Sequence, residues 1–376
     1  MTVQNVENKS GLSTEGVARV SARKPVDMQR SAGRLLRAAA EKFYDAEIDI
    51  DWDSPWEEGK YFLPEHRVSL YGTKLWERMS DEQKVELGRH EIVSILSFGI
   101  YAENLLSSAL LRTSAKGALT DQRSLYALNE IGDEARHSTM FAQLINKTGV
   151  APYKLPRGFL GFAKILHFVP LGPSVSGATL LIEEILDRAQ REAMNDPKMQ
   201  PHLRQLMKIH VLEEARHITF ARLDMVEGMQ RRGRISRAWH RGTLAVIANF
   251  AYPLLINPKV YPAVGIGRLR GLWAQQTSPN YRVNLQFMSE PMIRFFHEAG
   301  MVEGKFTMAM WRATRSLPDD LRCPARTGPG ARRPIRPTPR PDLSVRGLGR
   351  MTFPTPVTRP RAVQVRLLYF DQEIVT

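Results

Sequence analysis

The stretch Asp133-Glu134-Ala135-Arg136-His137 returns 80 residues later as Glu213-Glu214-Ala215-Arg216-His217. Each copy places a glutamate three residues before a histidine, and positions i and i+3 share one face of an α-helix. Two matched Glu-x-x-His motifs in apolar helical patterns are typical of carboxylate-bridged di-iron and di-manganese bundles. In such bundles, two helices each supply this motif and two others each supply one glutamate.

The rest of the chain is also rich in helical patterns. Helical spacing or composition occurs over 31–46, 81–112, 121–147, 174–194, 199–231, 235–250 and 281–299. The segments 47–71 and 251–280 are rich in proline, glycine and aromatic residues and are expected to be irregular. Neither βαβ alternation nor a glycine-rich phosphate loop is found, which argues against a nucleotide-binding fold. We therefore predict an all-α fold, a ferritin-like four-helix bundle with extra flanking helices.

Composition restricts the cellular setting and the kind of metal site. Of 376 residues, 43% are hydrophobic and a single one, Cys323, is cysteine. The core therefore has no disulfide, iron–sulfur cluster or thiolate zinc site, which suits a cytoplasmic protein. Residues 1–30 have no apolar signal core and are expected to form a disordered arm. The apolar stretches 158–182 and 243–268 are interrupted by prolines, so we expect no membrane span.

The net charge of +14 is concentrated in the C-terminal tail, because residues 301–376 hold 14 basic and 6 acidic residues. The segment 321–376 is rich in arginine and proline and is expected to be disordered, which leaves 31–320 as the folded domain. Such a tail could bind nucleic acid or acidic partners. A solvated tail without a specific partner is the simpler interpretation, so nucleic-acid binding is not expected. Translation in a shifted frame of a GC-rich gene is a further alternative.

The lone glutamates of the metal site can be chosen from helical geometry. Glu103 shares a helix face with Ile92 and Leu96, where an unpaired carboxylate is costly. On the later helix, Glu183 lies beside the apolar face at 100° per residue, whereas Glu184 lies on the opposite face. We therefore expect Glu183 to bind metal and Glu184 to face water and pair with Arg188.

A third histidine joins the set. His210 precedes Glu214 by four residues and His217 by seven, so the three side chains form one helical stripe. The proposed ligands are Glu103, Glu134, His137, Glu183, His210, Glu214 and His217. Oxygen and imidazole donors suit iron or manganese and O₂ chemistry. For Asp133, Glu213, Arg136 and Arg216, a supporting role beside the ligands and a surface position both stay open.

With these residues, the chain resembles the AurF-type non-heme di-iron oxygenases, the arylamine N-oxygenases. The resemblance rests on Glu103, Glu134-x-x-His137, Glu183 and His210-x-x-x-Glu214-x-x-His217, and it covers about residues 31–315. It implies a ferritin-like bundle with two iron ions. It also implies a peroxo-diferric species that oxygenates an aromatic amine, with O₂ as co-substrate. Electrons would come from an external donor such as ferredoxin or a similar reductase system.

The substrate is less constrained by the sequence. Tyr101 and Asn104 flank Glu103, and Arg294 on a C-terminal amphipathic helix could bind a substrate carboxylate through two contacts. For Arg294, a surface position is the alternative. Two other functions stay open: a di-iron hydroxylase or desaturase that acts on a lipid or carrier-bound substrate, and an iron-binding bundle without turnover. A homodimer also stays open.

Overall fold

The computed structural model describes residues 25–156, 158, 161 and 168–322. The predicted tail beyond Arg322 and the first 24 residues of the predicted arm lie outside these ranges. One correction concerns the arm, because a helix already begins at Met28, where the Asp27 side chain accepts a hydrogen bond from the backbone N–H of Arg30. Within the described ranges no strand occurs, and the only extended pairing is the bridge between Tyr61 and Met199.

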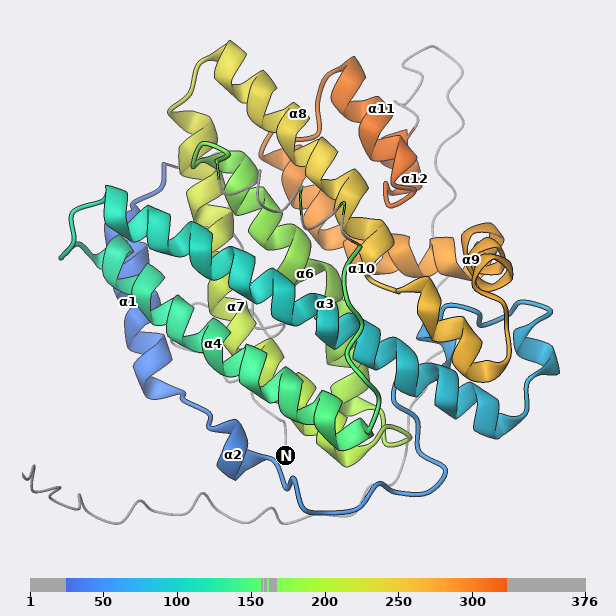
Figure 1. Cartoon of the computed structure of the whole chain (residues 1–376). Helices are drawn as coiled ribbons and strands as arrows, with labels where there is room; N and C mark the ends of the chain where they lie inside the picture. The colour runs from blue at the N-terminus through green and yellow to red at the C-terminus, as the bar shows by residue number, and fades with distance from the viewer. Residues whose placement is uncertain (1–24, 157, 159–160, 162–167, 323–376) are drawn as a thin grey trace, which may run out of the picture. The chain divides into compact units, whose positions relative to one another are not determined.

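Four long helices form a bundle and confirm the predicted all-α, ferritin-like fold (Figure 1). They are α3 (Asp81–Lys116), α4 (Gln122–Thr148), α6 (Pro173–Asn195) and α7 (Pro201–Gln230). α3 packs along α4, and α6 packs along α7, so the bundle consists of two helical hairpins. α3 begins with a capping box in which Ser80 and Gln83 exchange side-chain to backbone hydrogen bonds. The predicted boundaries of these helices agree with the structure to within a few residues.

Further helices surround the bundle. They are α1 (Met28–Glu41), α2 (Ala46–Asp49), α8 (Arg234–Ala251), α9 (Arg268–Thr277), α10 (Pro279–Glu298), α11 (Lys305–Ala313) and α12 (Asp319–Arg322). Short 3₁₀ turns are η1 (Glu65–Arg67), η2 (Trp76–Arg78), η3 (Tyr252–Leu254) and η4 (Pro258–Val264). α1 packs on α4 and α7, whereas α8 and α10 pack on α6, and α11 packs on α8.

The segment 251–280 was expected to be irregular, and α9 corrects this expectation. α9 has only ten residues, and its large apolar side chains Leu269 and Trp273 are 83% and 71% exposed. The helix therefore lacks the apolar stripe by which periodicity identifies a helix. The nine-residue helix α11 was missed as well.

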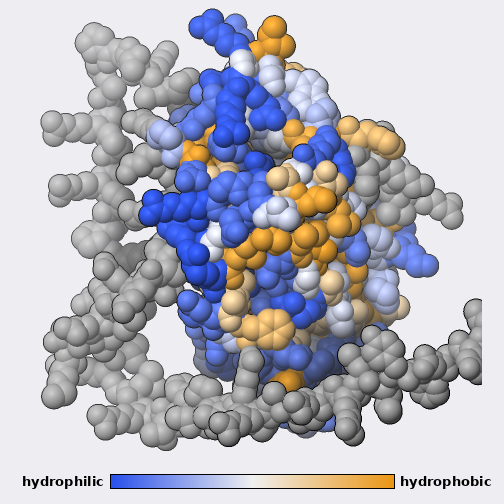
Figure 2. Space-filling model, turned by 90° about the vertical axis from the view of Figure 1, so that its left-hand side faces the viewer, coloured by the Kyte–Doolittle hydropathy of each residue, from blue (hydrophilic) through white to orange (hydrophobic). Residues whose placement is uncertain are grey.

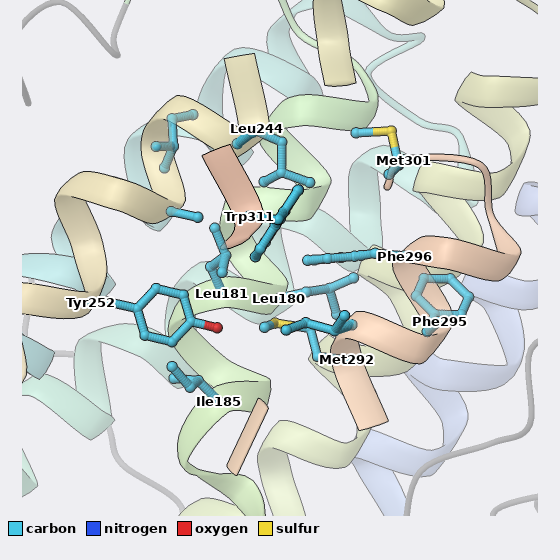
Figure 3. Close-up of a cluster of buried hydrophobic side chains, with 14 of the residues drawn as sticks. Leu180, Leu181, Ile185, Leu244, Tyr252, Met292, Phe295, Phe296, Met301 and Trp311 are labelled. Carbon is cyan, nitrogen blue, oxygen red and sulfur yellow. The ribbon is translucent and has the colours of Figure 1, made fainter. Parts of the chain in front are cut away.

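The hydrophobic core has two main parts. One lies where α6, α8, α10 and α11 meet, and Figure 3 shows Leu180, Leu244, Phe296 and Trp311 packed there. The other joins α3, α4 and α7 to the segments 50–79 and 256–264. Along α7, residues up to Ile209 belong to the second part and residues from Ile218 belong to the first. The second pentapeptide therefore lies between two apolar regions.

Helix α3 is, among the described helices, the one long and apolar enough to cross a membrane by length and composition. Half of its most apolar 18-residue window is buried inside the protein. The same helix carries the buried carboxylates of Glu91, which accepts hydrogen bonds from Ser69, and of Glu103, which belongs to the metal-binding residues of the bundle. These features are those of a core helix.

One end of the bundle, where α3 ends and α4 begins, carries exposed apolar side chains. Leu119 in the connecting turn is 72% exposed, and Leu125 at the start of α4 is 40% exposed. Figure 2 views the molecule from this side and shows apolar side chains gathered among charged ones. A homodimer stays a prediction, because this surface does not identify a partner.

Replacing Leu180 by alanine should destabilise the protein by about 2–5 kcal/mol, because this side chain is completely buried in the core shown in Figure 3. Urea unfolding at fixed metal content measures the change. Leu269→Ala is the matched control, since that leucine is 83% exposed and its loss should change the stability by less than about 0.5 kcal/mol. Equal effects of the two substitutions would contradict this description of the core.

Candidate metal centre

Two groups of acidic and histidine side chains meet at the centre of the bundle. One group is Glu103, His137, His210 and Glu214, and the other is Glu130, Glu134, Glu183 and His217. In each group, one ligand atom from every residue lies within 4.8 Å of the others. All eight residues are buried, with at most 5% of their surface exposed. The four bundle helices therefore converge on two adjacent sites for metal ions.

The structure brings together all seven ligands that the sequence predicted. α3 supplies Glu103 and α6 supplies Glu183, and the two Glu-x-x-His motifs lie on α4 and α7. The eighth residue, Glu130, was missed. A signal was present, because Glu130-x-x-x-Glu134-x-x-His137 has the same spacing as His210-x-x-x-Glu214-x-x-His217. Glu130 thus occupies on α4 the position that His210 occupies on α7.

Glu134 and Glu214 are placed to bridge the two sites. Nδ1 of His137 lies 3.1 Å from Oε2 of Glu134 and 3.1 Å from Oε1 of Glu214. Nδ1 of His217 lies 3.1 Å from Oε1 of Glu134 and 3.3 Å from Oε2 of Glu214. Each of the two carboxylates therefore directs one oxygen towards each histidine, as a carboxylate shared by two metal ions requires.

Unpartnered atoms indicate that these residues fit metal ions. Among the described residues, several buried atoms that could bind a metal ion have no hydrogen-bond partner. They are Oε2 of Glu103, Oε2 of Glu130, both carboxylate oxygens of Glu183 and Nε2 of His210. Buried polar atoms are nearly always paired, because leaving them unpaired is costly. Bound cations would satisfy them. The oxygen and imidazole donors, without sulfur, suit iron or manganese.

The electrostatics of the centre also favour cations. Burial, reinforced by repulsion from Glu134 and Glu214, raises the pKa of Glu103 and Glu183 well above the usual range. Burial raises the pKa of Glu130 to about 8. Without metal the centre therefore retains protons at neutral pH, and metal binding must displace them. Metal affinity should accordingly increase as the pH rises.

His210 is held as a neutral ligand. Its Nδ1 lies 2.9 Å from Oε1 of Gln190, and because an amide oxygen only accepts, Nδ1–H is the donor. Nε2 is then left with a lone pair, 3.6 Å from Oε1 of both Glu103 and Glu214. Burial lowers the pKa of His210 to about 4, so the ring stays uncharged. Gln190 therefore fixes both the tautomer and the orientation of this donor.

The first residues of the two pentapeptides support the opposite histidines. Nε2–H of His137 on α4 donates to Oε2 of Glu213 on α7, at 2.9 Å. Reciprocally, Nε2–H of His217 on α7 donates to Oδ2 of Asp133 on α4, at 3.2 Å. Such hydrogen bonds orient a histidine and increase its basicity towards a metal. For Asp133 and Glu213 the structure therefore supports a supporting role beside the ligands and not a surface position.

The two pentapeptide arginines compensate these outer carboxylates. Arg136 forms an ion pair with Asp133 and lies 3.6 Å from Oε1 of Glu213. Arg216 is 3% exposed and lies 3.2 Å from Oδ2 of Asp133. Burial raises the pKa of Asp133, but His217 and the two arginines outweigh this effect and lower the pKa below its usual range. Asp133 therefore stays ionised.

Glu184 corrects the expectation of a surface residue. It is 4% exposed and forms an ion pair with Arg222 of α7, whereas Arg188 contacts Glu290 of α10 instead. The physical reason is that α8 and α10 cover the outer side of α6. A face that would reach water in an isolated bundle is therefore buried.

An apolar cavity of about 100 Å³ lies beside the metal residues. Glu103, Glu183 and His210 form part of its wall. Most other wall residues are hydrophobic, among them Ile92, Leu96, Phe98, Phe141, Leu186 and Met288. The cavity therefore gives a small apolar molecule direct access to the metal residues.

The three predicted substrate residues lie elsewhere. Tyr101 and Asn104 are exposed, because Glu103 turns inwards and its neighbours on α3 turn outwards. Arg294 is exposed and forms ion pairs with Glu290 and Asp320. None of the three is among the described residues that line the apolar cavity. None of the three therefore borders the apolar cavity, and their part in substrate binding stays a prediction.

A second, larger cavity of about 640 Å³ reaches the centre at Glu130. Its wall carries both acidic and basic residues, including Arg123 and Asp224, which form an ion pair. Glu130 is the one residue of the two metal-binding groups in this wall, and the apolar cavity is lined by Glu103, Glu183 and His210 instead. Different ligands therefore border the two cavities.

Comparisons with known proteins agree with this geometry. The family model described as P-aminobenzoate N-oxygenase AurF matches residues 26–300. Relatives include the uncharacterized proteins Mb0909 of Mycobacterium bovis and Rv0885 of Mycobacterium tuberculosis, each 27% identical over 214 residues. The match spans 54% of this chain and 62% of each relative, so the chain covers less than two thirds of their length.

Glu130→Gln should weaken metal binding at one of the two sites, because it removes a carboxylate that faces Glu134, Glu183 and His217. We expect at least a roughly 10-fold higher dissociation constant for one metal ion, corresponding to about 1.4 kcal/mol. Stepwise metal titration of the apoprotein measures it. Glu91→Gln is the matched control, since Glu91 is equally buried but belongs to neither group. Two unchanged sites in Glu130→Gln would exclude Glu130 as a ligand.

Asp133→Asn should reduce metal affinity by about 10- to 100-fold while the ligands stay intact, because His217 loses its ionised hydrogen-bond partner. The same titration tests this expectation. Asp187→Asn serves as control, since Asp187 pairs with Arg191 outside both groups. An affinity that falls equally in the two variants would indicate a general loss of stability rather than a role beside the ligands.

Proposed function

The chain belongs to the P-aminobenzoate N-oxygenase AurF family, and on this premise we propose that it is an O₂-activating di-iron oxygenase that oxygenates the nitrogen of an aromatic amine. The observation that carries the proposal is the contact between the two groups of metal ligands and an apolar cavity. A site for metal alone would not require an adjoining space for an organic molecule.

Different residues of the chain would have different roles in such an enzyme. Glu134 and Glu214 would contribute to both metal sites, since each directs one oxygen towards either histidine. Glu103 and Glu183 would each complete one site, and both line the apolar cavity. A bound iron pair supplies the reduction of O₂. The apolar wall excludes water from the reacting atoms, which strengthens the electrostatic interactions there.

The size and lining of the cavity favour a single aromatic ring. A volume of about 100 Å³ between Phe98, Phe141 and Leu186 suits a small flat molecule better than an acyl chain. With its amine directed towards Glu103, Glu183 and His210, such a molecule would present the nitrogen to the metal ions. A lipid or carrier-bound substrate is the alternative, and it would require a longer channel.

The cellular setting follows from the same proposal. The reaction consumes electrons, so the enzyme needs an external donor such as a ferredoxin or a similar reductase system. We propose a cytoplasmic location, where such donors are available. The exposed apolar side chains at the α3–α4 turn, including Leu119, are a candidate surface for a protein contact.

Protein reconstituted under argon should bind two ferrous ions per chain, and His137→Ala or His217→Ala should lose iron and activity together, because each histidine belongs to one metal group. After reduction and exposure to O₂, mass spectrometry should detect an N-oxygenated product from an aniline. Turnover of carrier-bound acids without any aniline product would favour the hydroxylase or desaturase alternative. Iron oxidation without an organic product would indicate an iron-binding bundle.

A further inference from the structure

Basic residues are unevenly distributed along the second half of the folded chain. From Gly228 to Ser289 the sequence has nine lysine and arginine residues and no aspartate or glutamate. Five of the nine lie within eleven positions where α7 ends and α8 begins: Arg231, Arg232, Arg234, Arg237 and Arg241. A local excess of positive charge of this kind attracts an anionic partner.

Acidic neighbours balance only part of this charge. Arg231 pairs with Glu227, and Arg241 pairs with Glu303. The other three arginines form no ion pair with an acid among the described residues. Two of them donate to backbone oxygens, and the exposed Arg234 forms no hydrogen bond within the described part of the chain. Three positive charges therefore stay unbalanced at the turn from α7 to α8.

Exposed apolar side chains lie beside these arginines. Ile235 and Trp239 are 89% and 44% exposed, and with Gly242 they follow an i, i+4, i+7 pattern on one face of α8. Phe306 of α11 is 63% exposed and reaches the same face, because a Cβ atom on Gly242 would lie 3.7 Å from its Cε1. We define the α8 face as these three apolar side chains together with the exposed cations Arg234 and Lys305.

The α8 face is connected to the metal centre by a short path through the protein. The ring of Trp239 contacts the ring of the buried His240 edge to face, with the centroids 4.8 Å apart. Nδ1 of His240 lies 2.8 Å from Oγ of Ser174 at the start of α6. Ser174 precedes the metal-binding residue Glu183 by nine residues, or about 14 Å along the helix axis.

We propose that the α8 face is the docking surface for a small acidic electron-donor protein. This inference rests on the proposed function, in which one atom of O₂ oxygenates the amine nitrogen and the other leaves as water. That balance takes two protons and two electrons, and two one-electron donors are oxidised to supply the electrons. The unbalanced arginines steer an anionic donor towards the face, and the apolar side chains contact it there. Electron-transfer complexes have interfaces below about 1,200 Å², which suits a face with three apolar side chains.

An anionic membrane surface also attracts arginine and tryptophan side chains. Two observations favour the donor. The path through His240 and Ser174 ends at a metal-binding residue. In addition, Arg231 and Arg232 line the larger cavity, whose wall also includes Glu130 of the metal centre. Membrane attachment would require neither connection.

Binding without electron transfer tests the surface independently of turnover. The probe is an oxidised plant-type [2Fe–2S] ferredoxin, an acidic one-electron carrier, titrated calorimetrically into the oxidised iron-loaded protein at low salt. Arg234→Glu combined with Lys305→Glu should weaken binding at least about 10-fold, because like charges then face each other. Arg268→Glu with Arg270→Glu on α9 is the matched control, since it changes the net charge equally at two exposed positions. Equal losses in the two variants, or no binding to the unmodified chain, would overturn the inference.

The exposed tryptophans allow a second matched comparison. Under argon, pre-reduced ferredoxin should reduce the ferric protein at least about 10-fold more slowly in Trp239→Ala, because the apolar contact is lost. Trp273→Ala is the control, since Trp273 is 71% exposed on α9 outside the α8 face. Loss of the ferric absorbance measures the rate, and reduction by dithionite should be equal in both variants. Equal rates with ferredoxin would contradict the proposal.

Vesicles of phosphatidylglycerol and phosphatidylcholine test the membrane alternative by co-sedimentation. We expect Arg234→Glu with Lys305→Glu to lose ferredoxin binding, whatever its affinity for vesicles. If the variant loses only vesicle binding and still binds ferredoxin like the unmodified chain, the α8 face is a membrane surface and the proposal is wrong.

Failure of this inference and failure of the proposed function can be separated. Ferredoxin binding and reduction are measured under argon without an amine, whereas N-oxygenation is measured with dithionite-reduced protein after O₂ is admitted. If ferredoxin docks on the α8 face but no aniline is oxygenated, the reaction is wrong and the docking surface stands. If dithionite-reduced protein oxygenates an aniline but ferredoxin does not use the α8 face, the reaction stands and the docking surface is wrong.

Discussion

Five carboxylates buried at the centre of a helical bundle are the constraint on which the rest of this structure depends. Glu103, Glu130, Glu134, Glu183 and Glu214 lie together, at most 3% exposed and in contact with only three histidines. In a low-dielectric interior such a cluster is unstable unless protons or metal ions balance it. The raised pKa values of Glu103 and Glu183 indicate that protons balance the charge when no metal is bound. The unpartnered oxygens indicate where metal ions would balance it instead. A pair of divalent cations balances most of this charge and satisfies those atoms.

All four polar positions of the repeated pentapeptide contribute to the metal sites or to the balance of charge around them. In each copy the inner glutamate and the histidine face the metal sites, while the outer acid accepts a hydrogen bond from the histidine of the other copy. The arginines then balance the outer acids. The two halves are related in pattern but not identical, because His210 on α7 corresponds to Glu130 on α4. One metal site therefore includes a neutral imidazole, His210, where the other includes a carboxylate, Glu130. This difference coincides with the two cavities, since His210 borders the apolar cavity of about 100 Å³ and Glu130 borders the larger cavity of about 640 Å³.

Helical periodicity was sufficient to predict the bundle and seven of the eight residues in the two groups, because ligands on regular helices are fixed relative to their neighbours. Glu130 was missed although it lies one helical turn before Glu134, because a single glutamate on a helix is usually exposed and its burial depends on the helices packed around it. Glu184 was misplaced for a related reason. Its burial depends on α8 and α10, and the packing of distant segments cannot be inferred from the pattern of α6 alone. The cavity lining has the same origin, because the segments around Ser69 and Tyr281 reach the cavity only through tertiary packing.

The same electrostatic argument applies to the apolar cavity beside the metal residues. There the protein supplies excess negative charge from Glu103 and Glu183, so it requires cations. The neighbouring wall residues Phe98, Phe141 and Leu186 are uncharged and cannot replace those cations. An apolar wall also strengthens the attraction between the carboxylates and a bound cation, because little water remains to screen it. The lining that would surround an organic substrate therefore also increases the need for metal, so the space for a substrate and the dependence on metal have one physical cause.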